Sequence, residues 1–345
     1  MDAQSNPRAE GENAGPRRRR RWPFIVGGLV ALGLLVLAVG AVVVVLAVGA
    51  SGPGAPVAAY QEEYVSGEGA EKVAVVPVVG TIASADNSVP GTQPPVTPEG
   101  LADALRQAEE DPAVRAVVLE VNSPGGGTTA SDELHQSILD FRESSGKPVV
   151  VSMQDTAASG GYYISTAADR IVANETTLTG SLGVIFQLNN FTELAEKYGY
   201  QREIIKSGEF KDIANSFREL SPEDREILQS IVSESYDEFV SVIVEGRNLP
   251  EERVREIADG RVYSGLQARE IGLVDSFGGV DEAAEISQDL AGVDEATVVR
   301  YVQPETFTDA LLASFAPDKP DALQIAEEVG MTLEPKPYYL YLPGA

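Results

Sequence analysis

From residue 72 onward, short apolar stretches of the chain alternate with amphipathic ones. The apolar stretches predict β-strands at Val73–Val79, Ala116–Val121, Val149–Met153, Arg170–Ala173 and Arg202–Ile205. Apolar residues spaced three and four apart predict helices at about Thr97–Glu110, Ser131–Ser144, Phe191–Tyr198 and Pro222–Gly246. Strands that alternate with helices in this way are typical of an α/β fold.

The N-terminal region carries a long apolar run of another kind. Residues 23–50, with an uninterrupted apolar stretch from Phe24 to Ala50, are long enough to cross a bilayer as one helix. Five arginines, Arg17–Arg21, precede the run and predict that the tail 1–22 stays in the cytoplasm. The alternative is a cleaved secretory signal, because the run ends in the small residues Val48–Ser51. Both interpretations place the rest of the chain outside the cytoplasm.

The remaining organisation follows from these two regions. We expect a short linker at 51–71, one folded domain at 72–300 and a weakly patterned C-terminal tail at 301–345.

Charge and composition exclude several classes of function. The net charge is -27, and residues 51–345 carry 20 basic and 50 acidic side chains. Such an acidic domain repels phosphate backbones, so we expect no nucleic-acid partner. The chain has no cysteine and only one histidine, which removes thiolate catalysis and leaves little basis for a metal site.

Two predicted strands run into glycine-rich segments that could carry chemistry. Gly125–Gly127 could point backbone N–H groups at a bound oxygen, although a simple tight turn or a phosphate loop would have the same composition. No lysine follows it as in a nucleotide-binding loop. Ser159 stands between Ala157-Ala158 and Gly160-Gly161, where its hydroxyl would be accessible at the start of a helix. It could be a nucleophile or merely the N-cap of that helix.

A nucleophilic serine needs a base. His135, the single histidine, is expected on a solvated helix face, although a Ser-His-Asp arrangement stays an alternative, and the other neutralisable base is lysine. Lysine becomes a base only where burial beside apolar groups lowers its pKa. Lys206 and Lys211 lie in a predicted loop after a strand, with Phe210 and Ile213 nearby. Composition does not choose between these two lysines.

Six segments together resemble the signal peptide peptidase A family. They are Asn122–Gly126, Asp155–Tyr163, Lys206–Asp212, Thr179–Val184, Gly260–Gly265 and Gly272–Asp275. The resemblance spans about Lys72 to Gln288. It implies the Clp-protease and crotonase fold with repeated ββα-type units, which makes 72–300 a peptidase domain.

The resemblance also implies the roles of individual residues. Ser159 would be the nucleophile, Lys211 the general base, and the backbone N–H groups of Gly126 and Gly160 the oxyanion-hole donors, with no metal and no cofactor. Lys206 is the competing base. The single Ser-Gly-Gly segment resembles the short form of the family, for which the resemblance implies a homo-oligomeric ring whose lysine comes from the neighbouring protomer.

The expected function is therefore that of a membrane-anchored serine endopeptidase, with the catalytic domain outside the cytoplasm. Its substrates would be apolar peptides such as remnant signal peptides. One alternative is a membrane-anchored binding module of the same fold without turnover. The other is a crotonase-like acyl-CoA enzyme, which export from the cytoplasm disfavours. The apolar C-terminus, Tyr338–Ala345, is expected to pack on the domain as a strand or latch, or alternatively to dock in the active-site groove.

Overall fold

The structure, a computed structural model, describes residues 60–85, 94–303 and 337–340. The predicted cytoplasmic tail 1–22 and membrane helix 23–50 lie outside these ranges. Within them, no helix combines the length and the apolar character that a bilayer crossing requires.

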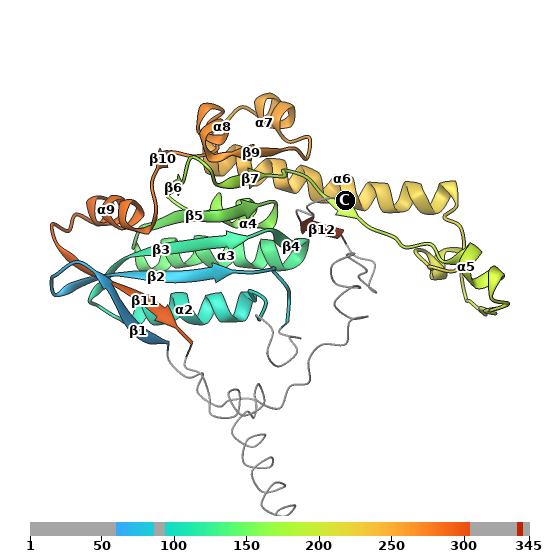
Figure 1. The fold of residues 1–345 in the computed structure, drawn as a ribbon, viewed down its shortest axis with the longest axis horizontal. Helices are drawn as coiled ribbons and strands as arrows, with labels where there is room; N and C mark the ends of the chain where they lie inside the picture. The colour runs from blue at the N-terminus through green and yellow to red at the C-terminus, as the bar shows by residue number, and fades with distance from the viewer. Residues whose placement is uncertain (1–59, 86–93, 304–336, 341–345) are drawn as a thin grey trace, which may run out of the picture. The chain divides into compact units, whose positions relative to one another are not determined.

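A mixed, mostly parallel sheet forms the centre of the domain, with the strand order β1-β11-β2-β3-β5-β6-β10 (Figure 1). Its strands are β1 (Gln61–Ser66), β2 (Glu71–Val79), β3 (Val114–Ser123), β5 (Val149–Ala158), β6 (Arg170–Ala173), β10 (Ser276–Phe277) and β11 (Ala296–Val302). Only the edge strand β1 is antiparallel to its neighbour in this row. The sheet branches at β5, whose last residues pair with β7 (Leu178–Gly180), and β7 pairs in turn with β9 (Val262–Ser264).

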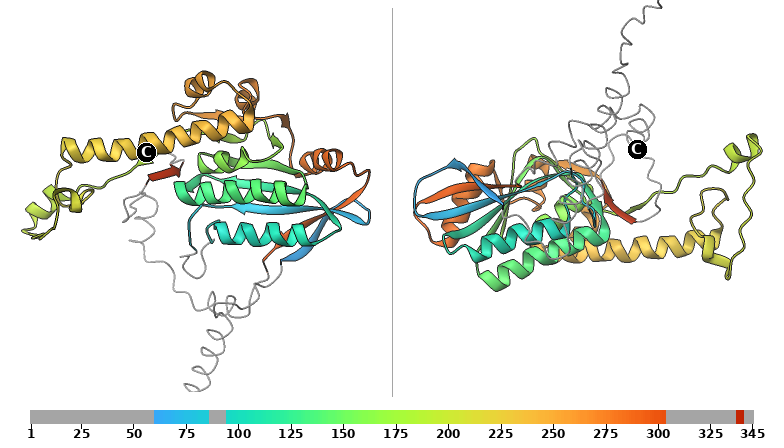
Figure 2. Two further views of the ribbon diagram at one scale, coloured as in Figure 1. Left: turned by 180° about the vertical axis from the view of Figure 1, so that it is seen from behind. Right: turned by 90° about the horizontal axis from the view of Figure 1, so that it is seen from below.

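Helices cover both faces of this sheet, as the views from the side and from below show (Figures 1 and 2). Successive strand residues point to opposite faces. Ala74 and Val76 of β2 therefore pack into a large core, whereas Val73 and Val75 pack into a smaller one. The large core includes residues of α2 (Pro98–Glu110), α3 (Thr128–Ser145), α4 (Gly160–Ser165), α6 (Pro222–Arg247), α7 (Glu251–Ile257) and α8 (Gly265–Glu270). The small core is closed by α9 (Val280–Ala291).

A second, small sheet lies beside the first one. It has the order β4-β12-β8 and consists of β4 (Gly125–Gly127), β12 (Pro337–Leu340) and β8 (Ile185–Phe186). Both pairings are antiparallel. The C-terminal strand β12 is therefore enclosed between two segments that are about sixty residues apart in the chain.

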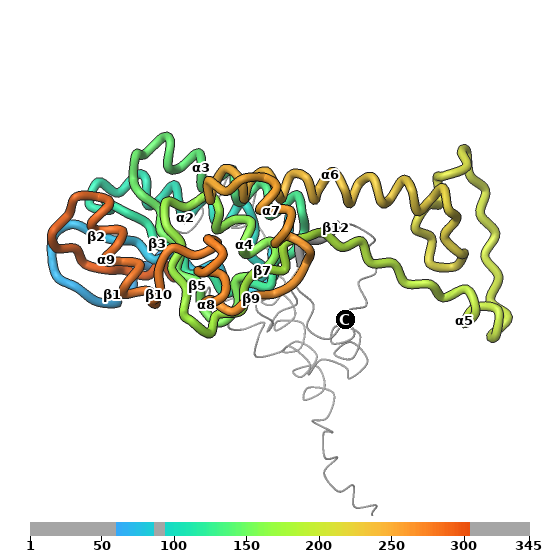
Figure 3. The backbone as a smooth tube through the Cα atoms, turned by 90° about the horizontal axis from the view of Figure 1, so that it is seen from above, coloured from blue at the N-terminus to red at the C-terminus, as the bar shows by residue number. Residues whose placement is uncertain are grey.

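An arm extends from the domain between β8 and α6 (Figures 1 and 3). We use "arm" for residues 187–221, which contain α5 (Thr192–Lys197) and the short 3-10 helix η1 (Glu209–Asp212). The rings of Phe191 and Tyr200 pack on Phe217, with centroids 6.1 and 5.4 Å away. The arm therefore has a small core of its own.

Most predicted elements are confirmed, with three differences. The predicted strand Arg202–Ile205 is wrong, because residues 201–206 have no regular structure. The predicted linker 51–71 contains β1, which pairs with β11 at the edge of the sheet. The predicted tail 301–345 contains the end of β11 and all of β12.

Candidate active site

Ser159 lies in a strained bend between β5 and α4. Its backbone has φ 52° and ψ −115°, a conformation that costs a non-glycine residue about 1–3 kcal/mol. Two hydrogen bonds hold it, from Ser159 N–H to Gly180 O (2.8 Å) and from Tyr163 N–H to Ser159 O (2.8 Å). Ser159 occupies the N-cap position of α4, but its side chain caps no helix N–H. Its hydroxyl is buried without a hydrogen-bond partner among the described residues.

The glycines after Ser159 permit α4 to approach β3 and β4 closely. A Cβ atom on Gly160 would lie 2.6 Å from Ser131 Oγ and 3.1 Å from the backbone nitrogen of Gly126. A Cβ on Gly161 would lie 2.7 Å from the carbonyl oxygen of Ser123. Since real Cβ atoms do not approach so closely, only glycine fits at both positions. The Ser-Gly-Gly sequence thus places the Gly160 backbone next to that of Gly126.

The glycine triplet is a strand rather than a simple turn. Ile82 N–H donates to Gly125 O (2.9 Å), and Gly127 N–H donates to Ile82 O (3.0 Å). Because neighbouring residues of a strand direct their N–H groups to opposite edges, the N–H of Gly126 faces away from Ile82. Gly126 must lack a Cβ, since one would lie 1.9 Å from Ile82 O. Its N–H therefore points to the other edge of β4, the edge that pairs with β12.

Four of the other segments that carry the family resemblance support this bend. Ser181 N–H donates to Arg261 O (2.7 Å) and Gly260 N–H donates to Leu182 O (3.1 Å). These bonds hold the end of β7, whose last residue, Gly180, accepts the hydrogen bond from Ser159 N–H. The Leu273 carbonyl accepts a bond of 2.9 Å from the hydroxyl of Tyr162, two residues into α4. The first segment contributes β4 itself.

Asp275, at the end of the sixth segment, fixes strand β6 and helix α6. Its carboxylate accepts hydrogen bonds from Ile171 N–H (2.7 Å) and from the Arg247 guanidinium (2.6 and 3.0 Å). Burial alone would raise the pKa of the Asp275 carboxyl, but these donors outweigh it and lower the pKa. The role of Asp275 is therefore structural.

His135 is buried, which corrects the expectation of a solvated helix face. It lies on α3 with 5% of its surface exposed, its ring edge against Tyr163, and its Nε2 3.1 Å from Thr166 Oγ1. Burial lowers the pKa of His135 to about 4, and the charge of Asp132 opposes this only in part. No hydrogen bond joins His135 to Ser159, so it is packed core rather than a base for the serine.

The structure does not bring the expected base to the expected nucleophile within one chain. Lys211 belongs to η1 on the arm, which projects beyond the domain away from α4 (Figures 1 and 3). Its side chain is exposed and forms no hydrogen bond or ion pair with the described residues. The apolar niche that a basic lysine requires is therefore absent from this surface of the single chain.

Sequence reasoning missed two residues that shape this region. Ile82 holds β4 by two backbone hydrogen bonds, yet nothing in its local sequence indicates a strand partner forty residues away. Ser131 is fully buried beside Gly160, and its hydroxyl has no hydrogen-bond partner among the described residues. The sequence signal that could have identified Ser131 is a polar residue on the core-facing side of the predicted helix Ser131–Ser144.

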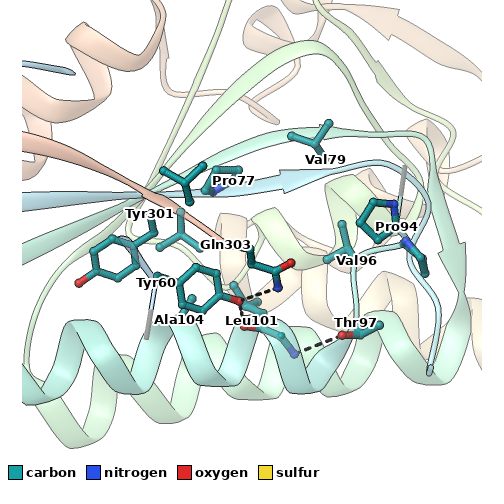
Figure 4. A pocket seen from close by; sticks show the side chains of 14 residues that line it. Tyr60, Pro77, Val79, Pro94, Val96, Thr97, Leu101, Ala104, Tyr301 and Gln303 are labelled. Atoms are coloured by element: carbon teal, nitrogen blue, oxygen red, sulfur yellow. Dashed lines mark hydrogen bonds between the residues drawn. The ribbon is translucent and has the colours of Figure 1, made fainter. Parts of the chain in front are cut away.

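A separate apolar cavity of about 290 Å³ lies between α2, β2 and the end of β11 (Figure 4). Tyr60, Val96, Leu101 and Tyr301 line it, and the Tyr60 hydroxyl donates to Gly100 O (2.8 Å). The lining includes no carboxylate, lysine or histidine, and no residue of the six segments. It is therefore not the site of the chemistry. In the described ranges, no group of three or more acidic or histidine side chains could hold a metal ion.

Comparison with known proteins agrees with this geometry. Residues 142–294 match the model of the family described as Peptidase family S49. A protein of Enterococcus faecium named "Putative signal peptide peptidase SppA" is 35% identical over 290 residues, which is 81% of this chain and 84% of that protein. Protease 4 of Haemophilus influenzae is 35% identical over 69% of this chain, and the chloroplastic serine protease SPPA of Arabidopsis thaliana 33% identical over 71%.

This chain spans little more than a third of the last two proteins, 38% and 36% of their lengths. The match to the Enterococcus protein extends over most of both chains and confirms the resemblance drawn from the six segments. A strained serine whose buried hydroxyl has no hydrogen-bond partner among the described residues is compatible with acyl transfer. The chain belongs to peptidase family S49 and is a serine peptidase.

Proposed function

We propose that this chain is a membrane-anchored serine endopeptidase in which Ser159 is the nucleophile and Lys211 of a second copy is the general base. The fold would be that of Clp proteases and crotonases, which the parallel sheet and the β5–α4 bend support. The observation that carries the proposal is the buried Ser159 hydroxyl, which has no hydrogen-bond partner in the described part of the chain and adjoins the close approach of the Gly126 and Gly160 backbones.

Elimination among the described lysines narrows the candidate bases to two. Lys72 is paired with Glu62 and Asp111, and Lys147 donates to three carbonyls at the end of α2. Lys206 donates to Asp212 Oδ1 and to Glu209 O, both at 2.7 Å. A base must have a free amine, which leaves Lys197 at the end of α5 and Lys211 of η1, and the family resemblance favours Lys211.

The surface of the arm supports a second copy as the source of that lysine. Several large apolar side chains of the arm are exposed, notably Ile205 (95%), Tyr198 (76%), Leu194 (54%) and Tyr200 (54%). Exposed apolar patches of this kind mark interaction surfaces. A neighbouring domain placed over the arm would bury these side chains and supply an apolar surrounding for Lys211. Repetition of the same contact closes a homo-oligomeric ring.

The chemistry then follows from the positions of these groups. Neutral Lys211 of one copy accepts the proton of the Ser159 hydroxyl of its neighbour, and the oxygen attacks the peptide carbonyl. The N–H groups of Gly126 and Gly160 stabilise the negative charge on the carbonyl oxygen. The amine product leaves with a proton from the lysine, and water hydrolyses the acyl-enzyme by the same proton route.

Location and substrate class belong to the same proposal. The apolar run 23–50 would anchor the chain after the arginines at 17–21, with the catalytic domain outside the cytoplasm. The name of the Enterococcus relative supports apolar peptides, such as signal peptide remnants, as substrates.

The experiment compares the purified full chain with Ser159→Ala and with Ser137→Ala, whose serine lies on the outer face of α3. A fluorophosphonate probe should label the wild type and Ser137→Ala but not Ser159→Ala. Hydrolysis of an apolar reporter peptide should follow the same order. Full hydrolysis by Ser159→Ala would reject the nucleophile, and hydrolysis by no form would favour a binding module.

A mixing experiment tests whether the lysine acts between copies. Ser159→Ala and Lys211→Ala should each be inactive, but a mixed assembly contains sites with both functional residues. Partial activity after mixing supports the exchange between copies. Absence of any recovery in assemblies proven to be mixed would reject it.

A further inference from the structure

Ser131 is a buried serine of helix α3 whose hydroxyl lies against the backbone that follows Ser159. Its side chain is fully buried, and its Oγ lies 2.6 Å from the position that a Cβ on Gly160 would occupy. That same position lies 3.1 Å from the backbone nitrogen of Gly126. The hydroxyl is therefore at the junction of the two backbone segments whose N–H groups are the proposed oxyanion-hole donors.

This hydroxyl differs from those of the two other buried serines inside the described helices. Ser165 of α4 donates to Gly161 O (2.6 Å), and Ser287 of α9 donates to Ala284 O (2.8 Å), so each bonds a carbonyl of its own helix. Ser131 is equally buried, yet its hydroxyl has no hydrogen-bond partner in the described part of the chain. Because a buried hydroxyl without a partner destabilises the folded state, its presence indicates a role other than stability.

Polar contacts between α3 and α4 set the position of α4 relative to Ser131. The two helices pack side by side (Figures 1 and 2). The Tyr163 hydroxyl donates to Asp132 Oδ1 (2.9 Å), and Thr166 Oγ1 lies 3.1 Å from His135 Nε2. Residues three apart lie on one side of a helix. The first residue of α4 therefore lies on the same side as these two and faces Ser131.

The glycine strand β4 fixes Ser131 from its other side. Helix α3 begins directly after β4, so Ser131 lies in the first turns of the helix, four residues after Gly127. The strand is itself held by the two backbone hydrogen bonds with Ile82. The Ser131 side chain is thus anchored to the segment that carries Gly126 and lies against the segment that carries Gly160.

We propose that Ser131 is a positioning residue of the oxyanion hole, whose hydroxyl keeps the Gly160 backbone at the distance from Gly126 that lets both N–H groups reach one oxygen. A bond back to its own helix would turn the hydroxyl away from Gly160, so the unpaired state is the consequence of this placement. Ser131 acts through the two backbone amides and touches no substrate. The inference rests on the proposed function, because it assigns a role within the oxyanion hole that serves Ser159.

Ser131→Ala should change stability and catalysis in opposite directions. Alanine removes the unpaired hydroxyl and favours a helix more than serine does, so the melting temperature should rise by about 2–4 °C. Without the hydroxyl, Gly160 can shift toward α3, and such a displacement should lower kcat by about 10- to 100-fold. The KM for the reporter peptide should change by less than about twofold, because no contact with the substrate is lost.

A peptide aldehyde with the sequence of the reporter tests the oxyanion hole itself. The serine oxygen adds to the aldehyde carbon, and the aldehyde oxygen then takes the place of the oxygen of the tetrahedral intermediate. The Ki of the aldehyde for Ser131→Ala should rise by the same factor by which kcat/KM falls. The corresponding peptide alcohol has no carbonyl to place in the hole, so its Ki should stay unchanged.

The matched control variant is Ser287→Ala, which removes a buried helical hydroxyl from the small core. That hydroxyl already has an acceptor in Ala284 O, so the melting temperature should not rise. The values of kcat/KM and of the aldehyde Ki should match those of the wild type, because α9 contributes no residue to the candidate site.

The outcomes separate this inference from the proposed function. If the wild type is active and Ser131→Ala has the same kinetics, the inference alone is overturned. It is also overturned if Ser131→Ala loses melting temperature together with activity, or if the Ki of the alcohol rises as much as that of the aldehyde, since either result describes a packing role. A wild type that neither hydrolyses the reporter nor reacts with the fluorophosphonate overturns the proposed function and, with it, this role of Ser131.

Discussion

Lys206 Nζ lies 2.7 Å from Oδ1 of Asp212, and this ion pair distinguishes the two lysines of the arm. Asp212 is further held by Arg218, at 3.2 Å. The bond from Lys206, followed by that from Arg218, lowers the pKa of the Asp212 carboxyl despite partial burial. The carboxylate thus engages Lys206 and holds η1 in shape. Lys211, five residues further on, remains directed to solvent.

Alanine substitution of each lysine tests this distinction. Lys211→Ala should lower kcat by about 10²–10⁴-fold, the usual contribution of a general base. Lys206→Ala should retain most of the activity, because it removes an ion pair with a half-exposed lysine and leaves the base in place. Steady-state kinetics with the reporter peptide measures both. Equal losses in the two variants would contradict the assignment of Lys211.

Two neighbouring glycines of β4 provide a sharp comparison. Gly126→Ala should abolish detectable hydrolysis and lower the melting temperature, because the new Cβ would lie 1.9 Å from the backbone oxygen of Ile82. Gly127→Ala should be close to wild type in both, since its Cβ would meet nothing nearer than Ala130 Cβ at 4.0 Å. Circular dichroism melting and the peptide assay measure the two effects. A fully active Gly126→Ala would exclude this backbone as part of the site.

The sequence permitted prediction of elements whose pattern is local. Helix α2 was predictable because Thr97 caps it, Pro98 opens it and its apolar face recurs with helical spacing. The strand predicted at Arg202–Ile205 failed because a strand needs a partner edge, and the arm offers none. Local composition carries no information about such a partner.

The candidate site was likewise predictable only in part from the sequence. The small residues around Ser159 indicate an accessible bend, and the resemblance to the family supplied its role. The strand character of Gly125–Gly127 was not predictable, because it arises from pairing with Ile82 and with β12, about 210 residues away. The separation of Lys211 from Ser159 likewise depends on the direction of the arm, which no periodicity encodes.

The buried histidine predicts a specific pH dependence. The pKa of His135 is about 4 in the folded chain and about 6.5 when unfolded, so acid protonates the unfolded chain first. The stabilising contribution of neutral His135 is complete above pH 6.5 and declines as the pH falls toward 4, by up to about 3 kcal/mol. The melting temperature of His135→Gln should therefore decrease less than that of the wild type when the pH is lowered from 7 to 4. Parallel losses would show that His135 is not responsible.

The Arg247–Asp275 pair is predicted to stabilise the domain more than a surface pair does. Asp275→Ala leaves the Arg247 guanidinium, with an 8% exposed side chain, without its partner and removes the acceptor of Ile171 N–H. We expect a loss of about 3 kcal/mol in the free energy of unfolding. Glu256→Ala removes the exposed partner of Arg253 and should cost under about 0.5 kcal/mol. Urea denaturation measures both, and similar values would contradict the structural role of Asp275.

The exposed apolar surface of the arm should be required for assembly. Ile205→Glu places a charge on the most exposed apolar side chain of the arm, and burial of that charge between copies would cost several kcal/mol. We expect a lower oligomer mass in light scattering. We also expect loss of peptidase activity, because Lys211 then no longer reaches Ser159 of the neighbouring copy. Tyr64→Glu, on a 65% exposed residue of β1 at the other end of the domain, is the control and should change neither. An intact, active oligomer of Ile205→Glu would exclude this part of the arm from the interface between copies.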